Sequence, residues 1–459
     1  MDRITQSIAA FATHLHFDDL PAEVVEVGRQ RLIDSLGCGL AAADCDQVRI
    51  AHRVFDGSAP GRLPGRVLGS SVKSAPMAAT FLNTAMIRYL DFNDFYPGGH
   101  PSDILGALLA IAESVEADGK RLLTSMVVAY EVFTRLSDSA KLRERGWDQG
   151  YAIGVATAAA VGNLLQLKAD ALRHGLAIVA VGSVPLRATR AGSLSHWKGA
   201  ATAYATHNAV LATLLAAEGM TGPEQPFQGR HGLWEQITGP FDLQPYEELG
   251  SQYLTPKTRL KYWPVEYNAQ AAVWAAKELR SRVPIADLAS IDVRVYWSAW
   301  HEIGSEPAKW DPQTRETADH SLPYIFARTL VDGAIDLGSF RETAFKDPTL
   351  RPLMAKIRVI QDDEIEALWP STVAMRVEAT DSAGKVHSIE VVNPLGHEDN
   401  PMQDSDVRAK FMSLAAPVLG EKRALDALET WWRVEELQHL NEAFDSIVIS
   451  PRMSMGTSQ

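Results

Sequence analysis

The first 220 residues carry apolar side chains at helical spacing in nearly every segment between turns, and this pattern limits the fold more than any other feature. The segments of this kind are 4–15, 24–43, 75–90, 104–115, 122–136, 151–167 and 200–219. Those at 151–167 and 200–219 are rich in alanine and other small residues, which lets neighbouring helices pack closely. The amino-terminal half is therefore predicted to be almost entirely helical.

The pattern changes after residue 264, where signals for β-strands appear between helical segments. Residues 291–296 alternate with period two, and residues 356–359 form a shorter candidate strand. Residues 373–379 and 386–392 flank Asp381-Ser382-Ala383-Gly384, an arrangement typical of a β-hairpin. Helical spacing is found at 269–282, 321–332 and 340–344, and it returns at 405–444. We predict a mainly α fold with an α+β second domain, and we expect the last helical segment to pack back on the first domain.

The composition is that of a soluble protein with a large core, since 46% of the 459 residues are hydrophobic and 22% are charged. The length suggests two or three domains. A formal net charge of −13 argues against nucleic acid and anionic membranes as main partners. No run approaches the roughly 18 uncharged apolar residues of a membrane span, and residues 1–15 lack the apolar core of a signal peptide. Cys38 and Cys45 give neither a disulfide framework nor a metal-binding pattern, so a cytoplasmic protein is predicted.

A polar, turn-rich stretch at 89–103, YLDFNDFYPGGHPSD, separates two apolar helical segments. It holds three acids, one histidine and a Gly-Gly pair. Such an insert is hard to bury unless its side chains have a function, and loops carried by rigid helices commonly hold the chemistry of a protein. The alternative is a surface loop in which Ser102 or Asp103 caps the following helix.

Two further polar clusters open predicted helices. In GWDQG at 146–150, Asp148 and Gln149 either belong to a site or lie in the first turn of the next helix, where an acid favours the helix dipole. In SHWKG at 195–199, Lys198 lies beside a helix amino terminus, where an ammonium group and free N–H groups make a good anion site. The alternative for Lys198 is a solvated surface lysine.

Two more clusters lie near the expected domain boundary. The segment 260–270 places Lys261 in an aromatic setting, and the alternative is a domain hinge along which Lys261 extends past Tyr262. The segment 316–324 carries Asp319, His320 and Tyr324 around a helix start. In the simpler interpretation Asp319 only caps that helix and Tyr324 belongs to the core.

The sequence has no GxGxxG, Walker, HExxH, CxxC or GxSxG motif, so nicotinamide, nucleotide and zinc chemistry are poorly supported. The acid–base and cationic groups that remain are Asp91, His100, Lys198, Lys261 and Tyr324. Such a set suits the removal of a proton next to a carboxylate, with lysines holding carboxylates and stabilising the charge that develops on them.

Taken together, these clusters resemble the MmgE/PrpD family, which includes 2-methylcitrate dehydratases, cis-aconitate decarboxylases and related epimerases. The matching elements are RLIDSLGCGLAA at 31–42, YLDFND and GGHPSD within 89–103, GWDQG at 146–150, WKG at 197–199, KYWPVEYNAQ at 261–270, ETADHSLPY at 316–324 and NPLGHEDNP at 393–401. They span most of the chain, and KYWPVEYNAQ and TADHSLPY look most like the MmgE-type branch.

The resemblance implies an architecture and a set of partners. It implies a helical domain built from both chain ends, 1–265 and 401–459, and a smaller α+β lid domain, 266–400. It further implies a site in the cleft between them, a homodimer, a small polycarboxylate substrate and no cofactor. Because no cluster in the sequence has the spacing of metal ligands, we also expect that no metal is needed.

The resemblance also implies residue roles. Lys198 and Lys261 grip substrate carboxylates, and His100, oriented by Asp91, moves the proton. Tyr324 binds a carboxylate or serves as the acid. Polar residues of the same motifs are expected to contact substrate, namely Asn93, Ser102, Gln149 and His320.

The chain departs from dehydratase-like members at three positions, where it has Gln149 and Asn268 in place of histidines and Phe95 in place of a common threonine. The first hypothesis is a lyase that removes water from 2-methylcitrate or a related hydroxylated di- or tricarboxylate. An epimerase or isomerase needs no acid for a leaving hydroxide, which suits the missing histidines, and decarboxylation is a third variant. A catalytically inactive binding protein is disfavoured, because a scaffold has no need for Asp91, His100 and both lysines.

Overall fold

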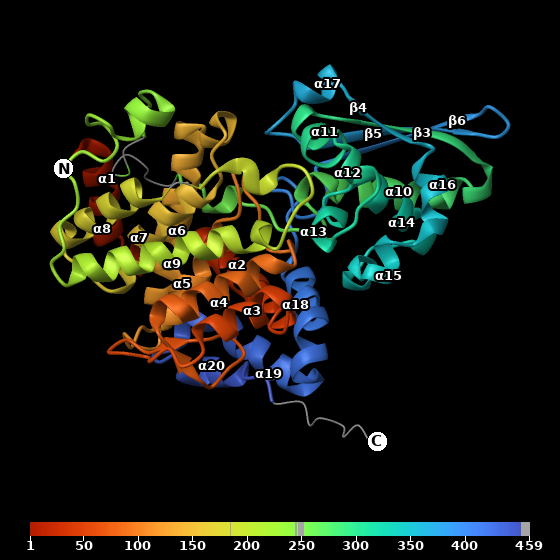
Figure 1. The fold of residues 1–459 in the computed structure, drawn as a ribbon. Helices are drawn as coiled ribbons and strands as arrows, with labels where there is room; N and C mark the ends of the chain where they lie inside the picture. Colours follow the sequence, from red (N-terminus) through yellow and green to blue (C-terminus); the bar gives the residue numbers. More distant parts are fainter. Residues whose placement is uncertain (184, 244–245, 247–251, 451–459) are drawn as a thin grey trace.

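The computed structural model describes residues 1–183, 185–243, 246 and 252–450, and these form a large helical part and a smaller α+β part that meet at one side (Figure 1). The amino-terminal helices are α1 Arg3–His14, α2 Ala22–Ala41, α3 Asp46–Phe55, α4 Pro76–Tyr89, α5 Leu105–Ile111, α6 Gly119–Ala140, α7 Gly150–Leu164, α8 Ala169–Gly182 and α9 Trp197–Ala217. A two-stranded ribbon, β1 Gly65–Arg66 with β2 Lys73–Ser74, precedes α4.

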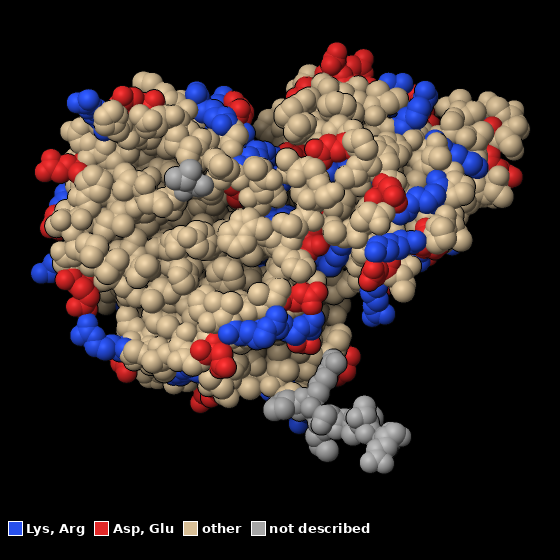
Figure 2. All heavy atoms as spheres, viewed as in Figure 1, with Lys and Arg blue, Asp and Glu red and all other residues tan. Residues whose placement is uncertain are grey.

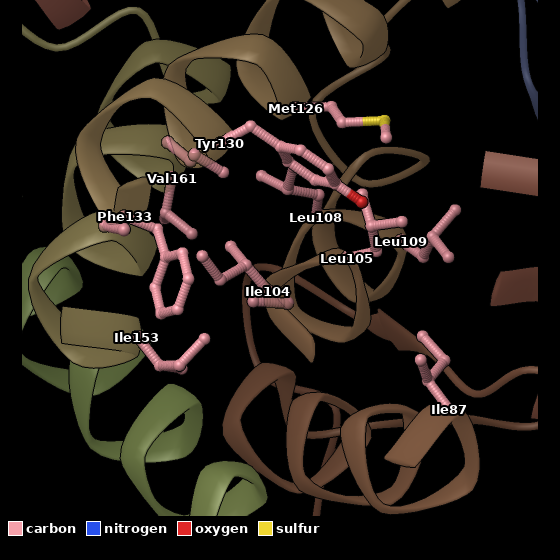
Figure 3. Close-up of a cluster of buried hydrophobic side chains, with 14 of the residues drawn as sticks. Ile87, Ile104, Leu105, Leu108, Leu109, Met126, Tyr130, Phe133, Ile153 and Val161 are labelled. Carbon is pink, nitrogen blue, oxygen red and sulfur yellow. The ribbon is translucent and has the colours of Figure 1, made fainter. Parts of the chain in front are cut away.

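The centre of the helical part is α5, whose residues are all buried. A helix that is apolar on every side is stable only inside a protein. Side chains of 104–109 meet Tyr130 and Phe133 of α6 and Ile153 of α7, and Figure 3 shows these groups converging. The loop at 89–103 joins α4 to α5, so both of its ends are fixed by helices that lie mostly in the core.

The carboxyl-terminal helices return to this part of the protein. They are α18 Asp404–Leu419, α19 Glu421–Trp432 and α20 Asn441–Ser446, and α18 packs against α2. Phe411 and Trp431 belong to the same hydrophobic cluster as Ile4 and Leu32, so the two chain ends share one core.

The lid domain, as we call the α+β part, is built on a four-stranded sheet in the order β4-β3-β5-β6. The strands are β3 Leu288–Val295, β4 Ile357–Gln361, β5 Ala374–Asp381 and β6 Val386–Val392. Strands β3 and β4 are parallel, and the other pairs are antiparallel. The helices α10 Gln270–Arg282 and α14 Leu322–Asp332 contact the sheet and each other, and in Figure 1 they lie on one side of it. Shorter helices complete the domain: α11 Trp297–Ile303, α12 Pro307–Trp310, α13 Arg315–Ala318, α15 Glu342–Phe345, α16 Arg351–Met354 and α17 Asp363–Glu366.

The predicted fold class is confirmed, because a helical domain made of both chain ends carries a smaller α+β domain. Every predicted strand is present within a few residues of its expected bounds. The helices α3 and α8 were not predicted from the sequence. Among the described residues, no helix has the length and apolarity needed to cross a membrane.

Candidate active site

The loop between α4 and α5 is held by a buried network centred on Asp94. One oxygen of the Asp94 carboxylate accepts hydrogen bonds from Ser102 N–H at 3.1 Å and Ser102 Oγ at 2.5 Å, and the other accepts from Tyr130 Oη at 2.7 Å. Asn93 Nδ2 donates to Ser102 Oγ at 2.8 Å and to Asp103 Oδ1 at 2.9 Å. Asn93 and Ser102, predicted to bind substrate, are fully buried and do not line the cavity described below. They fix the shape of the loop.

The Gly-Gly pair permits a close approach that no other residue allows. Gly99 has φ 155°, and a β-carbon at this position would lie 1.7 Å from Gln149 Oε1. That same oxygen accepts a hydrogen bond of 2.8 Å from the backbone N–H of His100. Gln149 directly precedes α7, so the GWDQG motif holds the backbone of His100 in place through the side chain of Gln149.

Three buried cationic side chains donate hydrogen bonds to the Asp91 carboxylate. Its Oδ1 accepts from Arg88 Nη1 at 2.7 Å and from Lys261 Nζ at 2.6 Å, and its Oδ2 accepts from Lys198 Nζ at 3.0 Å. Burial alone would raise the pKa of the Asp91 carboxyl, but Arg88 and the two lysines hold this pKa well below its usual range. Asp91 is therefore a permanent carboxylate and cannot act as a general base near neutral pH.

His100 presents one ring nitrogen to the cavity. Its Nδ1 lies 2.6 Å from the carbonyl oxygen of Asp94, which can only accept, so Nδ1 carries the proton. Its Nε2 lies 3.7 Å from Asp91 Oδ1. Burial, with Arg88 and Lys261 nearby, lowers the pKa of His100 well below 6.5, so the ring is neutral at rest. The ring was predicted to be oriented by Asp91; its hydrogen bond is instead to the Asp94 carbonyl, and Asp91 lies 3.7 Å from the other ring nitrogen.

A second imidazole, His320, faces Asp91 from the lid domain. Its Nδ1 donates to Asp319 Oδ1 at 2.6 Å, and its Nε2 lies 3.5 Å from Asp91 Oδ2. Burial and Lys198 lower the pKa of His320 to about 4, so this ring is also neutral. His100 and His320 thus approach one carboxylate from the two domains, each with an unprotonated Nε2.

Both histidines line a cavity of about 50 Å³ between the helical part and the lid domain. This volume holds only a few water molecules. The other lining residues are Arg88, Asp91, Phe95, Gly98, Gly99, Arg143, Asp148, Gln149, Arg187, Arg190, Glu266 and Glu302. Figure 2 shows charged side chains of both signs on either side of the notch between the two parts.

The four arginines of the cavity wall are the largest omission from the sequence-based set. Arg143 and Arg187 both contact Glu302 of the lid domain, the first at 3.2 Å, and Arg190 Nε lies 2.8 Å from Asp148 Oδ2. Arg88 directly precedes YLDFND, and Arg143, Arg187 and Arg190 lie before GWDQG and SHWKG, but arginines at such positions indicate no particular site in a sequence. In the cavity lining these four arginines are matched by four carboxyl groups, those of Asp91, Asp148, Glu266 and Glu302.

The predicted positions of Lys198, Lys261 and Tyr324 need correction. Both lysines are buried and bonded to Asp91, and neither lines the cavity, so they are not placed to grip a substrate. Tyr324 Oη donates to the carbonyl of Ser339 inside the lid core, and Tyr324 does not line the cavity either. We therefore leave Tyr324 out of the proposed catalytic set.

Asp91, Asp319 and His320 offer ligand atoms within 4.8 Å of one another, the spacing of a metal site. Lys198 Nζ already lies 3.0 Å from Asp91 Oδ2 and 3.2 Å from Asp319 Oδ1. An ammonium group at this place satisfies both carboxylates and would have to leave before a cation entered. The donor set therefore fits an ammonium better than a metal ion.

The family of the chain follows from comparison of its sequence with known proteins. The model of the MmgE/PrpD N-terminal domain matches residues 6–245, and that of the MmgE/PrpD C-terminal domain matches residues 263–434. The chain belongs to the MmgE/PrpD family.

Individual MmgE/PrpD proteins are similar over most of their length. A 2-methylcitrate dehydratase of Cupriavidus necator is 29% identical over 407 residues, covering 81% of this chain and 82% of the relative. A 2-methylcitrate dehydratase of Salmonella typhimurium is 26% identical, with 91% and 92% covered. A cis-aconitate decarboxylase of Aspergillus terreus is 25% identical, with 98% and 95% covered. The relatives therefore include both dehydratases and decarboxylases.

Two further MmgE/PrpD motifs, RLIDSLGCGLAA and NPLGHEDNP, contribute residues that contact the segments around the site. Lys410 of α18 donates to the carbonyls of Phe92 and Lys261 at 2.7 and 2.8 Å, and it lies 2.6 Å from Asp34 Oδ1. Arg259 contacts Glu398 of the NPLGHEDNP element. These two groups tie the loop at 89–103 and the Lys261 segment to both ends of the chain.

Proposed function

We propose that this MmgE/PrpD protein is a cofactor-independent lyase that removes water from a hydroxylated di- or tricarboxylate such as 2-methylcitrate. The observation that carries the proposal is a neutral imidazole, His100, in a cavity walled by four arginines. Its relatives named as 2-methylcitrate dehydratases support the same reaction class.

In the proposed reaction His100 Nε2 accepts the proton from the carbon next to a substrate carboxylate. Its Nδ1–H stays on the Asp94 carbonyl, so the ring keeps its orientation while it becomes positive. Asp91, whose Oδ1 is 3.7 Å from Nε2, stabilises that imidazolium. A general base of this kind increases the reaction rate by a factor of about 10²–10⁴.

The substrate carboxylates are bound by arginines in this proposal, in place of the lysines. Arg143, Arg187 and Arg190 have planar guanidinium groups that match a carboxylate in two-point contact. Glu302 and Asp148 occupy them in the present structure. A substrate carboxylate would take over the contacts that Glu302 makes, while Lys198 and Lys261 keep Asp91 ionised.

One observation favours epimerisation as the second candidate. His100 and His320 approach Asp91 from different domains, at 3.7 and 3.5 Å, and both are neutral. In a two-base epimerisation one neutral imidazole removes the proton from one face, and the other, after taking up a proton from solvent, delivers it to the opposite face. The relatives named as cis-aconitate decarboxylases keep decarboxylation as a third possibility.

A substrate screen separates these reactions. The protein is incubated in deuterated water with 2-methylcitrate, citrate, cis-aconitate or an amino-dicarboxylate, and ultraviolet absorbance and deuterium uptake are followed. Growth of an enoate band from a saturated substrate indicates dehydration, exchange without a band indicates epimerisation, and release of carbon dioxide indicates decarboxylation. The His100→Ala protein, purified in parallel, controls for contaminating enzymes, and absence of all three signals would contradict the proposal.

A further inference from the structure

Glu266 is the cavity carboxyl that the reaction described above does not use. It lies at the start of the lid domain, it lines the same cavity as His100, and its backbone N–H donates to the Asp319 carbonyl at 3.1 Å. No cation forms an ion pair with its carboxyl group within the described part of the chain. In a site where the other carboxylates are paired with arginine or lysine, this makes Glu266 unusual.

The orientation of Glu266 is fixed by Asn268. The backbone N–H of Asn268 donates to Glu266 Oε2 at 2.7 Å, and Asn268 Nδ2 donates to Oε1 at 3.0 Å. Tyr296, itself buried, donates its hydroxyl to Asn268 Oδ1 at 2.5 Å. Because the oxygen of the amide is held by Tyr296, its NH₂ group must face Glu266. The amide of Asn268 does not titrate, so of these two side chains only the Glu266 carboxyl can carry and release a proton.

We propose that Glu266 is the general acid of the reaction, the group that protonates the leaving hydroxyl. This rests on the proposed dehydration. His100 Nε2 takes the C–H proton, the C–H electron pair forms the carbon–carbon double bond, and the C–O bond breaks as the hydroxyl takes the Glu266 proton and leaves as water. The enzyme is left with a His100 imidazolium and a Glu266 carboxylate, and exchange of one proton through solvent restores the starting state.

The charges around Glu266 suit this role. The pKa of the Glu266 carboxyl is raised to about 7, mainly by burial and further by Asp91 and Glu302, against the opposing effects of Lys261 and the Asn268 N–H. An acid with a pKa near the working pH holds a proton yet releases it readily. The opposing pKa shifts of His100 and Glu266 assign base and acid to two residues of one cavity, contributed by the two domains.

The test compares two leaving groups in the full-length protein. Hydroxide needs a proton in order to leave, whereas fluoride leaves with much less help. In Glu266→Gln, we expect kcat for the elimination of water to fall by a factor of about 10²–10⁴. With the substrate analogue that has fluorine in place of the hydroxyl group, we expect this variant to eliminate fluoride at the wild-type rate. The alkaline fall of kcat/KM near pH 7 should disappear in the variant. Glu390→Gln, an exposed lid position, is the matched control.

The outcomes separate this inference from the proposed function. If wild-type protein dehydrates its substrate while Glu266→Gln loses both eliminations equally, or neither, Glu266 is not the acid. If wild-type protein forms no enoate from any polycarboxylate, the proposed function itself fails. Should Glu266→Gln not fold, Asn268→Ala replaces it, because loss of the orienting amide should slow water elimination and spare fluoride elimination.

Discussion

At the scale of single residues, Asp91 determines the properties of the site. It adopts a left-handed backbone conformation with φ 50°, which turns its side chain back toward Arg88 of the preceding helix. It also accepts Lys261 Nζ through its backbone carbonyl at 2.7 Å. Burial lowers the pKa of both nearby histidines, and the cations bound to Asp91 lower it further, whereas the Asp91 carboxylate itself opposes the shift. The neutral state of the two imidazoles therefore results from burial and from the cations together.

His100→Ala tests the base. We expect kcat to fall by about 10²–10⁴ because no other imidazole on this wall can take the proton, while binding of the substrate carboxylates to the arginines is retained. Steady-state kinetics and isothermal titration with substrate measure the two effects. His52→Ala, at an exposed position on α3, should behave as wild type. Near-normal turnover of His100→Ala would remove this residue from the mechanism.

The acid side of the pH profile follows from the same residue. Since burial and Arg88 lower the pKa of His100 well below 6.5, the base stays unprotonated as the pH falls through 6.5. We therefore expect kcat/KM to hold its value at that pH and to decline only in more acidic buffer, as the imidazole becomes protonated. A decline centred at 6.5 or above, measured with a substrate whose own ionisation is corrected for, would contradict the depressed pKa.

Asp91→Asn tests the buried ion cluster. The substitution leaves Arg88, Lys198 and Lys261 without their common carboxylate, and loss of one member of a buried pair typically costs about 3–5 kcal/mol. We expect a loss of this size in the free energy of unfolding, measured by urea denaturation. Asp292→Asn, which removes the partner of the exposed Arg358 on the sheet, should cost far less. Equal losses would show that the cluster around Asp91 contributes little.

At the scale of elements, the two domains meet through polar contacts around the site. Glu302 of α11 bridges Arg143 and Arg187, and Arg315 of α13 donates to the Tyr89 carbonyl at 3.0 Å. Apolar contacts accompany them, since Phe95 stacks on Tyr267 with ring centroids 4.2 Å apart and belongs to the hydrophobic core of the lid domain. Polar contacts between domains are readily exchanged for contacts with solvent or with a ligand.

We therefore expect the lid domain to move when substrate binds. A cavity of about 50 Å³ is much smaller than typical ligand sites of roughly 300–1,000 Å³, so the domains must separate to admit a tricarboxylate. Closure around the polyanion would then exclude water from it. Hydrogen exchange of α11 and of residues 187–190 should slow at saturating substrate, whereas the hairpin β5–β6 serves as an internal reference. Unchanged exchange in these segments would count against the motion.

At the scale of the whole molecule, helix α9 carries an unpartnered apolar stripe. Trp197, Tyr204 and Leu211 recur every seven residues and are 46%, 52% and 39% exposed. Residues at this spacing lie on one face of a helix, and contiguous exposed apolar surface commonly marks a protein–protein contact. We propose that this face is where two copies of the chain associate as the predicted homodimer.

The dimer proposal predicts the effect of a charge on α9. Leu211→Glu should convert the protein to monomers, because a charge buried in an apolar interface is strongly unfavourable. Light scattering coupled to size-exclusion chromatography gives the mass of both proteins. Val386→Glu, a similar change at an exposed site on the lid hairpin, is the control. A dimeric Leu211→Glu protein, or a monomeric wild type, would exclude this interface.

The sequence alone determined the elements of the fold and the segments that form the site. Periodicity is a local property, so the period of two in 291–296 and the turn at 381–384 predicted β3 and the β5–β6 hairpin. The loop at 89–103 was identified for the same reason, since polar residues between two buried helices need partners. His100, Gln149 and His320 do lie together at the cavity.

Only the tertiary structure decided what each charged residue does. Lys198 and Lys261 lie 107 and 170 residues from Asp91 along the chain, and no local pattern shows that this carboxylate occupies both. Arg187 and Glu302 likewise meet only because the lid domain folds against the helical part. The role of a charged side chain depends on its bonding partners and on its exposure to solvent. For buried groups, both are set by packing between segments that lie far apart in the sequence. That is why the lysines of the sequence motifs are bonded to Asp91 here, and why the arginines of the cavity wall escaped prediction.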